Sequence, residues 1–413
     1  MRPPARRAAR ALSGAGLAAA LLLPAAGPAQ AAPPARPPAA DGKGQELPGM
    51  PSALDPDADQ AECTPASGEK AKKQDWSRQR LDLDRLHRHH TGAGVTVALI
   101  GTGVAPDAAG LDGRVTAQGA AGDDCVGNGT FLAGLIAGTG GGTPGLAGVA
   151  PGARILALRG TDERGEAAAG PAAAAVRAAT AAEADVIAVA VALPDRDGEL
   201  TDAVADARGE GAVVVAAATP DPPRGGADEI PPRTYWPAGE PGVLSVADML
   251  PDGTRPTGAL PTTGIDLAAP GAGVVSGGPR GDGHYLGAGA AVAAAYAAGA
   301  AAVVRATHPD DSADAVAHRL TATAYPADIP QLDPYAAVTT VLGEPGANTR
   351  AERAAGPVTV RDTSAADRAT DRATLFVVLG SAGVAAVLWA AFAIPRARAR
   401  GWRPAEAGGT DGK

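Results

Sequence analysis

The chain has 413 residues, a formal net charge of −9 and 45% hydrophobic residues, of which few are aromatic. It has no basic stripe and no platform of aromatic residues, and this composition argues against nucleic-acid binding. Because alanine is abundant and aromatic residues make up only 3%, any core has to be built from small aliphatic groups. The arginine clusters lie near the two ends, so the middle of the chain is more acidic than the total suggests.

Residues 1–31 have the layout of a secretory signal peptide. Several arginines come first, an apolar stretch covers Leu12–Ala26, and Ala29-Gln30-Ala31 forms a cleavage site before Ala32. The apolar stretch is short and interrupted by proline, which favours a cleaved signal over a membrane helix. We therefore expect the rest of the chain to be exported.

Residues 32–75 form a Pro-rich, charged extension that is not expected to have an ordered core of its own. Its alternating Asp55, Asp57 and Asp59 could suggest calcium, but a solvated acidic loop is the preferred interpretation. No metal and no cofactor is predicted.

Two cysteines in an exported protein suggest one disulfide. Cys63 lies in the extension and Cys125 lies in the middle of the chain, so a bridge would tie the extension to the domain. Two unpaired thiols remain the alternative.

Residues 76–345 read as one large α/β domain. Continuous apolar runs, such as the one ending at Gly101, suit strands that are buried on both faces of a parallel sheet. Alanine-rich stretches of helical length lie between the runs, for example Pro171–Ala184 and Asp202–Arg208. The alternation predicts a mainly parallel central sheet flanked by helices, with enough residues for one buried core.

Near the end, residues 373–394 form an uncharged apolar run that is long enough to cross a bilayer. A polar linker, residues 346–372, comes before the run, and Pro395 is expected to end it. Four arginines follow in the tail, residues 395–413, and they predict that the tail stays in the cytoplasm. The expected layout is a single-pass type I protein of the cell membrane, with the main domain outside the cell.

Three glycine-rich segments resemble the catalytic motifs of the subtilases, the subtilisin-like serine peptidases. They are residues 97–104, residues 124–130 and residues 289–299. Four further segments resemble other landmarks of that family in the right order: 148–158, 184–190, 235–246 and 266–271. The resemblance implies a three-layer subtilisin-like fold.

The same resemblance places the triad Asp, His and Ser of the family on Gly101, Asn128 and Ala291. The oxyanion-hole Asn of the family falls on Pro220, which has neither a side-chain donor nor a backbone N–H. A hydroxyl becomes a nucleophile only when a base takes its proton. The chain is therefore expected to lack protease activity.

Within the subtilases, the chain resembles the mycosins, the membrane-anchored members of actinobacterial type VII secretion systems. The resemblance rests on the signal peptide, the cysteine in a Pro-rich extension, Asp124-Cys125 shortly before the His position, and the C-terminal span followed by arginine. It implies association with the membrane complex of that secretion machinery.

Several interpretations remain open. The first is a pseudoprotease that acts as a structural or interaction component of a type VII secretion system. An active serine endopeptidase that uses relocated groups is the second, and a module that binds a peptide without cutting it is the third. An unselected relic is a further alternative. If the cleft binds a peptide, the occupant is expected to be the protein's own extension or a segment of a secretion partner.

Overall fold

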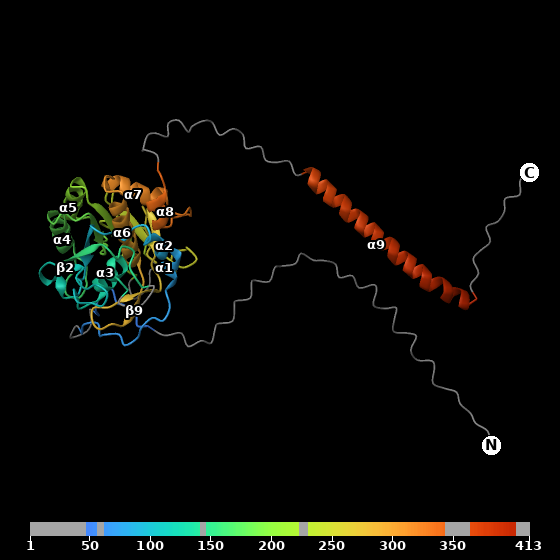
Figure 1. The fold of residues 1–413 in the computed structure, drawn as a ribbon, viewed down its shortest axis with the longest axis horizontal. Coiled ribbons are helices and arrows are strands. Elements are labelled where there is room, and N and C mark those ends of the chain that lie inside the picture. Colours follow the sequence, from blue (N-terminus) through green and yellow to red (C-terminus); the bar gives the residue numbers. More distant parts are fainter. Residues whose placement is uncertain (1–46, 56–61, 141–145, 223–229, 343–363, 402–413) are drawn as a thin grey trace, which may run out of the picture. The chain divides into compact units, whose positions relative to one another are not determined.

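The computed structural model describes residues 47–55, 62–140, 146–222, 230–342 and 364–401 (Figure 1). The predicted signal peptide lies outside the described residues, as do most of the predicted linker and most of the tail. The chain divides into two units, Met1–Thr340 and Val341–Lys413.

The first unit contains a parallel seven-stranded sheet, as the apolar runs predict. Its strands lie in the order β2-β3-β1-β4-β5-β6-β7, and every neighbouring pair is parallel. They are β1 (Thr96–Gly101), β2 (Val115–Ala117), β3 (Arg154–Arg159), β4 (Val186–Val189), β5 (Val213–Ala217), β6 (Leu244–Met249) and β7 (Leu267–Pro270). β8 (Val274–Gly277) and β9 (His284–Gly287) form a separate antiparallel ribbon.

The helices of this unit connect the strands and cover both faces of the sheet. They are α1 (Trp76–Arg80), α2 (Leu83–Leu86), the 3-10 turn η1 (Gly119–Gly122), α3 (Asn128–Ala137), α4 (Ala169–Ala181), α5 (Gly198–Gly209), α6 (Ala290–Thr307), α7 (Ala313–Ala322) and α8 (Pro334–Thr339). The two helices expected near 171–184 and 202–208 are α4 and α5. α5 begins earlier than expected because the Asp197 side chain accepts a hydrogen bond from the Leu200 N–H and caps it.

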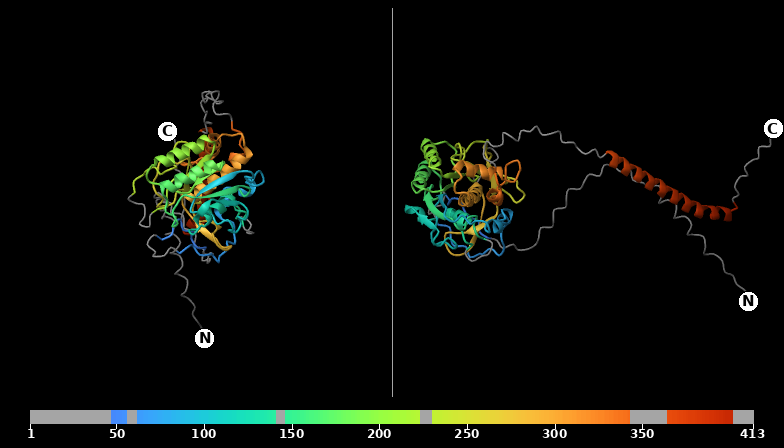
Figure 2. Two further views of the ribbon diagram at one scale, coloured as in Figure 1. Left: turned by 90° about the vertical axis from the view of Figure 1, so that its left-hand side faces the viewer. Right: turned by 45° about the horizontal axis from the view of Figure 1, so that its top comes forward.

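Side chains along β1 alternate between two hydrophobic cores, so the fold has three layers. Val97 and Leu99 belong to the core shared with α3 and α6, whereas Ala98 and Ile100 belong to the core shared with α4 and α5. The views in Figures 1 and 2 show α4 and α5 (green) away from α6 (orange). This arrangement confirms the α/β architecture.

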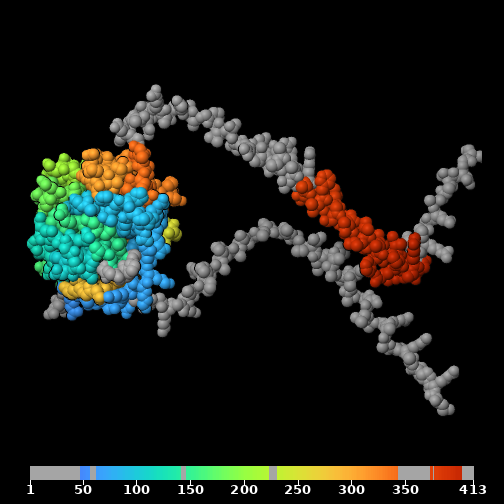
Figure 3. Space-filling model, in the orientation of Figure 1, coloured from blue at the N-terminus to red at the C-terminus, as the bar shows by residue number. Residues whose placement is uncertain are grey.

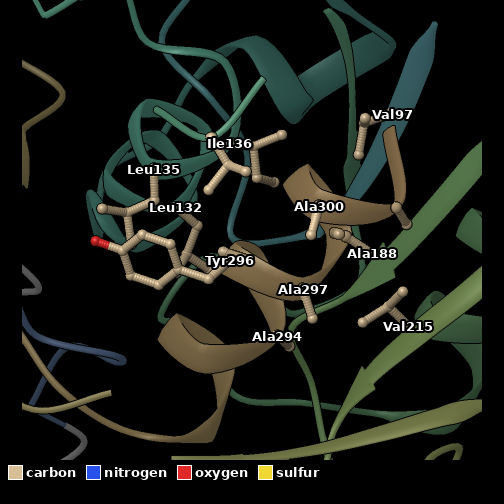
Figure 4. Close-up of a cluster of buried hydrophobic side chains, with 14 of the residues drawn as sticks. Val97, Leu132, Leu135, Ile136, Ala188, Val215, Ala294, Tyr296, Ala297 and Ala300 are labelled. Carbon is tan, nitrogen blue, oxygen red and sulfur yellow. The ribbon is translucent and has the colours of Figure 1, made fainter. Parts of the chain in front are cut away.

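Alanine on α6 allows the helix to lie close to the sheet. Ala294, Ala297 and Ala300 are at most 2% exposed, and they lie near the strand residues Ala188 and Val215 (Figure 4). In this part of the core, small side chains on both elements replace the large aliphatic groups of a typical sheet–helix interface.

The β8–β9 ribbon carries part of the extension along one edge. Gly49 pairs with Leu286 in parallel: the Leu286 N–H donates to Pro48 O at 2.8 Å, and the Met50 N–H donates to Leu286 O at 2.7 Å. In Figure 3 the blue residues of the extension border the gold ribbon at the lower edge of the domain. The described part of the extension therefore packs on the domain and forms no core of its own.

The second unit contains one long helix, α9 (Ser364–Ala399). Its segment Phe376–Ala399 contains an 18-residue window with a mean hydropathy of 2.2 and no buried residues, which makes it a candidate membrane span. The helix begins inside the predicted linker, because residues 365–373 are rich in the good helix formers alanine and arginine. It also continues through Pro395, contrary to the prediction that this proline ends it.

Candidate active-site cleft

The first two of the four expected catalytic positions lie at the end of β1 and the start of α3. Gly101 is the last residue of β1 and is buried, and Asn128 is the first residue of α3. Their chain neighbours are joined directly, because the Gly129 N–H donates to the Thr102 hydroxyl oxygen at 2.8 Å. The first two positions therefore form one side of a site.

The carboxylate of Asp124, which is 2% exposed, holds this side together. It accepts hydrogen bonds from the Thr102 hydroxyl at 2.8 Å, the Gly127 N–H at 2.8 Å, and both the N–H and the hydroxyl of Thr130 at 2.8 and 2.7 Å. Charge-assisted bonds of this kind are stronger than neutral ones. A carboxylate is thus present beside these two positions, but all its contacts hold the turn between β1 and α3.

The other two expected positions, Pro220 and Ala291, lie beyond the end of β5 and in the first turn of α6. They too are linked through neighbours. A carboxylate oxygen of Asp221 lies against the Cα of Gly289 so closely that a Cβ there would overlap it. Ala291 itself is half-buried. The last two positions form the second side of the site.

The residues at the four positions supply no nucleophile, base or orienting carboxylate. Gly101 and Ala291 have no functional group, and the Asn128 amide does not accept a proton near neutral pH. Space for side chains remains, since a Cβ on Gly101 would make only an ordinary contact of 3.6 Å with Ala190 Cβ. The assignment of these positions to the triad stays a prediction.

The extension runs past both sides of the site. The sulfur of Met50 lies 3.1 Å from where a Cβ of Gly127 would be, directly before Asn128. Further along, the Leu54 N–H donates to Arg164 O at 2.8 Å. The segment 47–55 therefore reaches from β9, past the start of α3, to the loop that follows β3.

The predicted disulfide is confirmed. Cys63 and Cys125 are bonded, with their Cα atoms 4.5 Å apart. The Thr64 N–H also donates to Cys125 O at 2.9 Å, which adds a main-chain contact beside the bridge. The extension is thereby fixed to the residue that follows Asp124.

A relocated triad needs a serine, a histidine and a carboxylate together, and Ser276, His284 and Asp282 line one small cavity of about 30 Å³. Ser276 donates its hydroxyl proton to Phe131 O at 2.9 Å. His284 Nδ1 accepts the Ala71 N–H at 2.8 Å, so the neutral ring carries its proton on Nε2 and has no free lone pair.

The charges around these three side chains also make His284 a poor general base. Burial lowers the pKa of His284, and the cations Lys70 and Arg78 lower it more. Asp282 is paired with Lys70. The three side chains are thus engaged in structural bonds and do not form a charge-relay arrangement.

The sequence did not predict three carboxylates that matter at the site. Asp124 lies in the Asp-Cys pair quoted above, but its bonds to Thr102 and Thr130 depend on the folded turn. Asp221 and Asp248 come together only because β5 and β6 are neighbours in the sheet. Among the described residues, no group of three or more His, Cys, Asp or Glu side chains could hold a metal ion.

A strand–turn arrangement at the ends of β1 and β5, with a helix starting at each side of the site, is typical of a subtilisin-like peptidase domain. The subtilase family (Peptidase_S8) matches residues 92–369, and the chain belongs to this family.

Its curated relatives include mycosins. Mycosin-1 of Mycobacterium tuberculosis is 32% identical over 306 residues, covering 60% of this chain and 68% of the relative. Mycosin-3 of the same organism is 30% identical over 315 residues, covering 60% of this chain and 66% of the relative. Among solved structures, the MycP3 protease from the type VII (ESX-3) secretion system covers 72% of this chain and 98% of its own, with 29% identity and a TM-score of 0.59.

Proposed function

We propose that this chain is a mycosin-like subtilase without protease activity that serves as a structural or interaction component of a type VII secretion membrane complex. One observation supports the inactivity: none of Gly101, Asn128, Pro220 and Ala291 has a group able to perform its catalytic step, while hydrogen bonds hold the turn around Gly101 and Asn128 in place. The secretion role is supported by similarity to MycP1, which is described as an essential component of the type VII (ESX-1) secretion system.

The anchoring follows from α9. We place the domain outside the cell as a single-pass type I protein, because four arginines follow the apolar run 373–394 within and after α9 and the exported domain precedes it. Protease added to intact cells should remove the domain and leave a short membrane fragment. Full protection of the domain in intact cells, with digestion only after lysis, would show the opposite topology, with the domain inside the cell.

The test of inactivity uses the purified full chain in detergent. A fluorophosphonate probe that labels activated serines should give no signal, and casein should remain intact. A variant that combines Gly101→Asp, Asn128→His, Ala291→Ser and Pro220→Asn is the matched control, since it restores the four groups in the same frame. Labelling of the unaltered chain would contradict the proposal, whatever the variant does.

A second candidate function, a cleft that binds a peptide without cutting it, is favoured by the path of the extension. The main-chain bonds of Pro48 and Met50 to Leu286 are those of strand addition. Hydrogen exchange tests the extension as occupant by comparing the chain with a form that lacks residues 32–62. Protection around 127–130 and 286–290 should fall in the shortened form, and unchanged protection would leave only an external occupant.

A further inference from the structure

A pocket of about 690 Å³ remains open on the second side of the site. Its walls include the extension at 49–52, the stretch 219–222 after β5, and residues 286–290 that lead into α6. Asp248 of β6, residues 256–260 and residues 272–273 complete the lining. The extension therefore borders this space without filling it. A volume of this size is in the range of pockets that hold small groups.

Two carboxyl groups lie in the pocket. Asp248 of β6 is only 6% exposed, and its one side-chain partner among the described residues is Arg255, whose nitrogen lies 3.4 Å from a carboxylate oxygen. Asp221 lies nearer the rim: the residue as a whole is exposed, but its carboxyl group is enclosed between Gly289 and the extension. Among the described residues, Arg255 is thus paired with Asp248 alone, and no cation is paired with Asp221.

Both acids are held in surroundings that disfavour their charge. Burial raises the pKa of Asp248, an effect that Arg255 only partly offsets. Burial also raises the pKa of Asp221, a hydrogen bond with Ser52 opposes this, and the charge of Asp248 adds to the increase. A cation placed between the two carboxylates would offset the unfavourable burial of both negative charges.

The rest of the lining suits an alkyl chain. Pro51, Leu260 and Leu286 contribute apolar surface, and Ala288 and Ala290 leave room beside it. Lysine and arginine place methylene groups along apolar walls and carry their charge at the tip. This combination of apolar walls and two acidic groups is complementary to such a side chain.

We propose that this pocket binds the lysine or arginine side chain of a partner polypeptide. The inference rests on the second proposed function, in which the cleft binds a peptide without cutting it, and it specifies the chemistry of the occupant. The charged tip lies between Asp248 and Asp221, and the methylenes lie along Leu260 and Leu286.

The probe is the acetylated and amidated pentapeptide Ala-Ala-Lys-Ala-Ala with a fluorescent label, and its match has norleucine in place of lysine. Anisotropy with the full chain in detergent should show that the lysine peptide binds at least about tenfold more tightly. Asp248→Asn should abolish that preference, whereas Asp202→Asn, an exposed acid on α5, should retain it. Equal binding of the two peptides to the unaltered chain would overturn the inference.

Asp221→Asn provides a second measurement if Asp248→Asn does not fold, since the part of the chain that the structure describes contains no ion pair with Asp221 for this change to break. The preference for lysine should fall severalfold in this variant, and an unchanged preference would count against the pocket. Mass spectrometry of the recovered peptide separates the two proposals. A cleaved peptide would refute the non-cutting function, whereas an intact peptide with no lysine preference would refute only the pocket chemistry.

Discussion

On the first side of the candidate site, five hydrogen bonds around Asp124 and Thr102 join the end of β1 to the start of α3. On the second side, the loop after β5 and the residues before α6 border an open pocket. The first side contains buried donors on the backbone that a carboxylate satisfies, so its geometry is held without any catalytic group. Within the described residues, the second side has no comparable set of hydrogen bonds around one carboxylate, and there an open pocket leaves room for a ligand.

The comparison predicts that changes on the first side cost stability. Gly129→Ala should have the largest effect, because the new Cβ would overlap Gly103 O, a backbone atom that cannot move without shifting the turn. We expect a loss of about 4 kcal/mol or more in the free energy of unfolding. Urea denaturation of residues 32–340 measures it. Gly170→Ala in α4, where a Cβ meets nothing within 4 Å, is the control and should be close to neutral.

Breaking the disulfide should cost about 4 kcal/mol in the same assay, since the bridge closes a loop whose ends are 62 residues apart. Cys63→Ser and Cys125→Ser should give similar losses. The double variant should lose no more than either single one, because each change alone removes the whole cross-link. Additive losses would show that the thiols contribute separately and that the bridge does not fasten the first side.

Asp124→Asn should lower the free energy of unfolding by about 3 kcal/mol, since an amide replaces one acceptor oxygen with a donor that faces Gly127 or Thr130. Asp123→Asn, one residue earlier and exposed, is the matched control. Similar values for the two variants would mean that the hydrogen bonds of Asp124 do not hold the frame.

The smallest effect is expected on the second side. Ala291→Ser should change the free energy of unfolding by no more than about 0.5 kcal/mol, because the position is half-buried and near a helix start. The new hydroxyl should not react with a fluorophosphonate, since no base is available to activate it. Labelling of this variant would show that an unrecognised base faces the start of α6.

The main strands and the disulfide could be predicted from local sequence signals. The apolar runs that became β1 and β5 are long enough to be recognised alone, and the only two cysteines could pair only with each other within the chain. The pocket could not be predicted in this way. Asp221 and Asp248 are 27 positions apart and meet through the pairing of β5 with β6 and through the path of a loop.

The prediction that Pro395 ends the apolar helix was wrong, because it too relied on one local signal. A proline removes one backbone donor and disfavours the preceding helical turn, so it predicts an end. The cost is local, and the helix formers on both sides, with alanine and arginine after Pro395, favour continuation to Ala399. Propensity summed over many residues outweighed one unfavourable position.

The pairing of Gly49 with Leu286 has a consequence for association between chains. Two-stranded ribbons have two open edges, and an unpaired edge is a template for strands from other molecules. The extension blocks one edge of the β8–β9 ribbon with strand-type hydrogen bonds to Leu286, while its covalent attachment at Cys63 keeps it nearby. A foreign strand can reach this edge only by displacing a tethered competitor, so the ribbon is protected from accidental pairing and open only to a partner that binds more tightly than the extension.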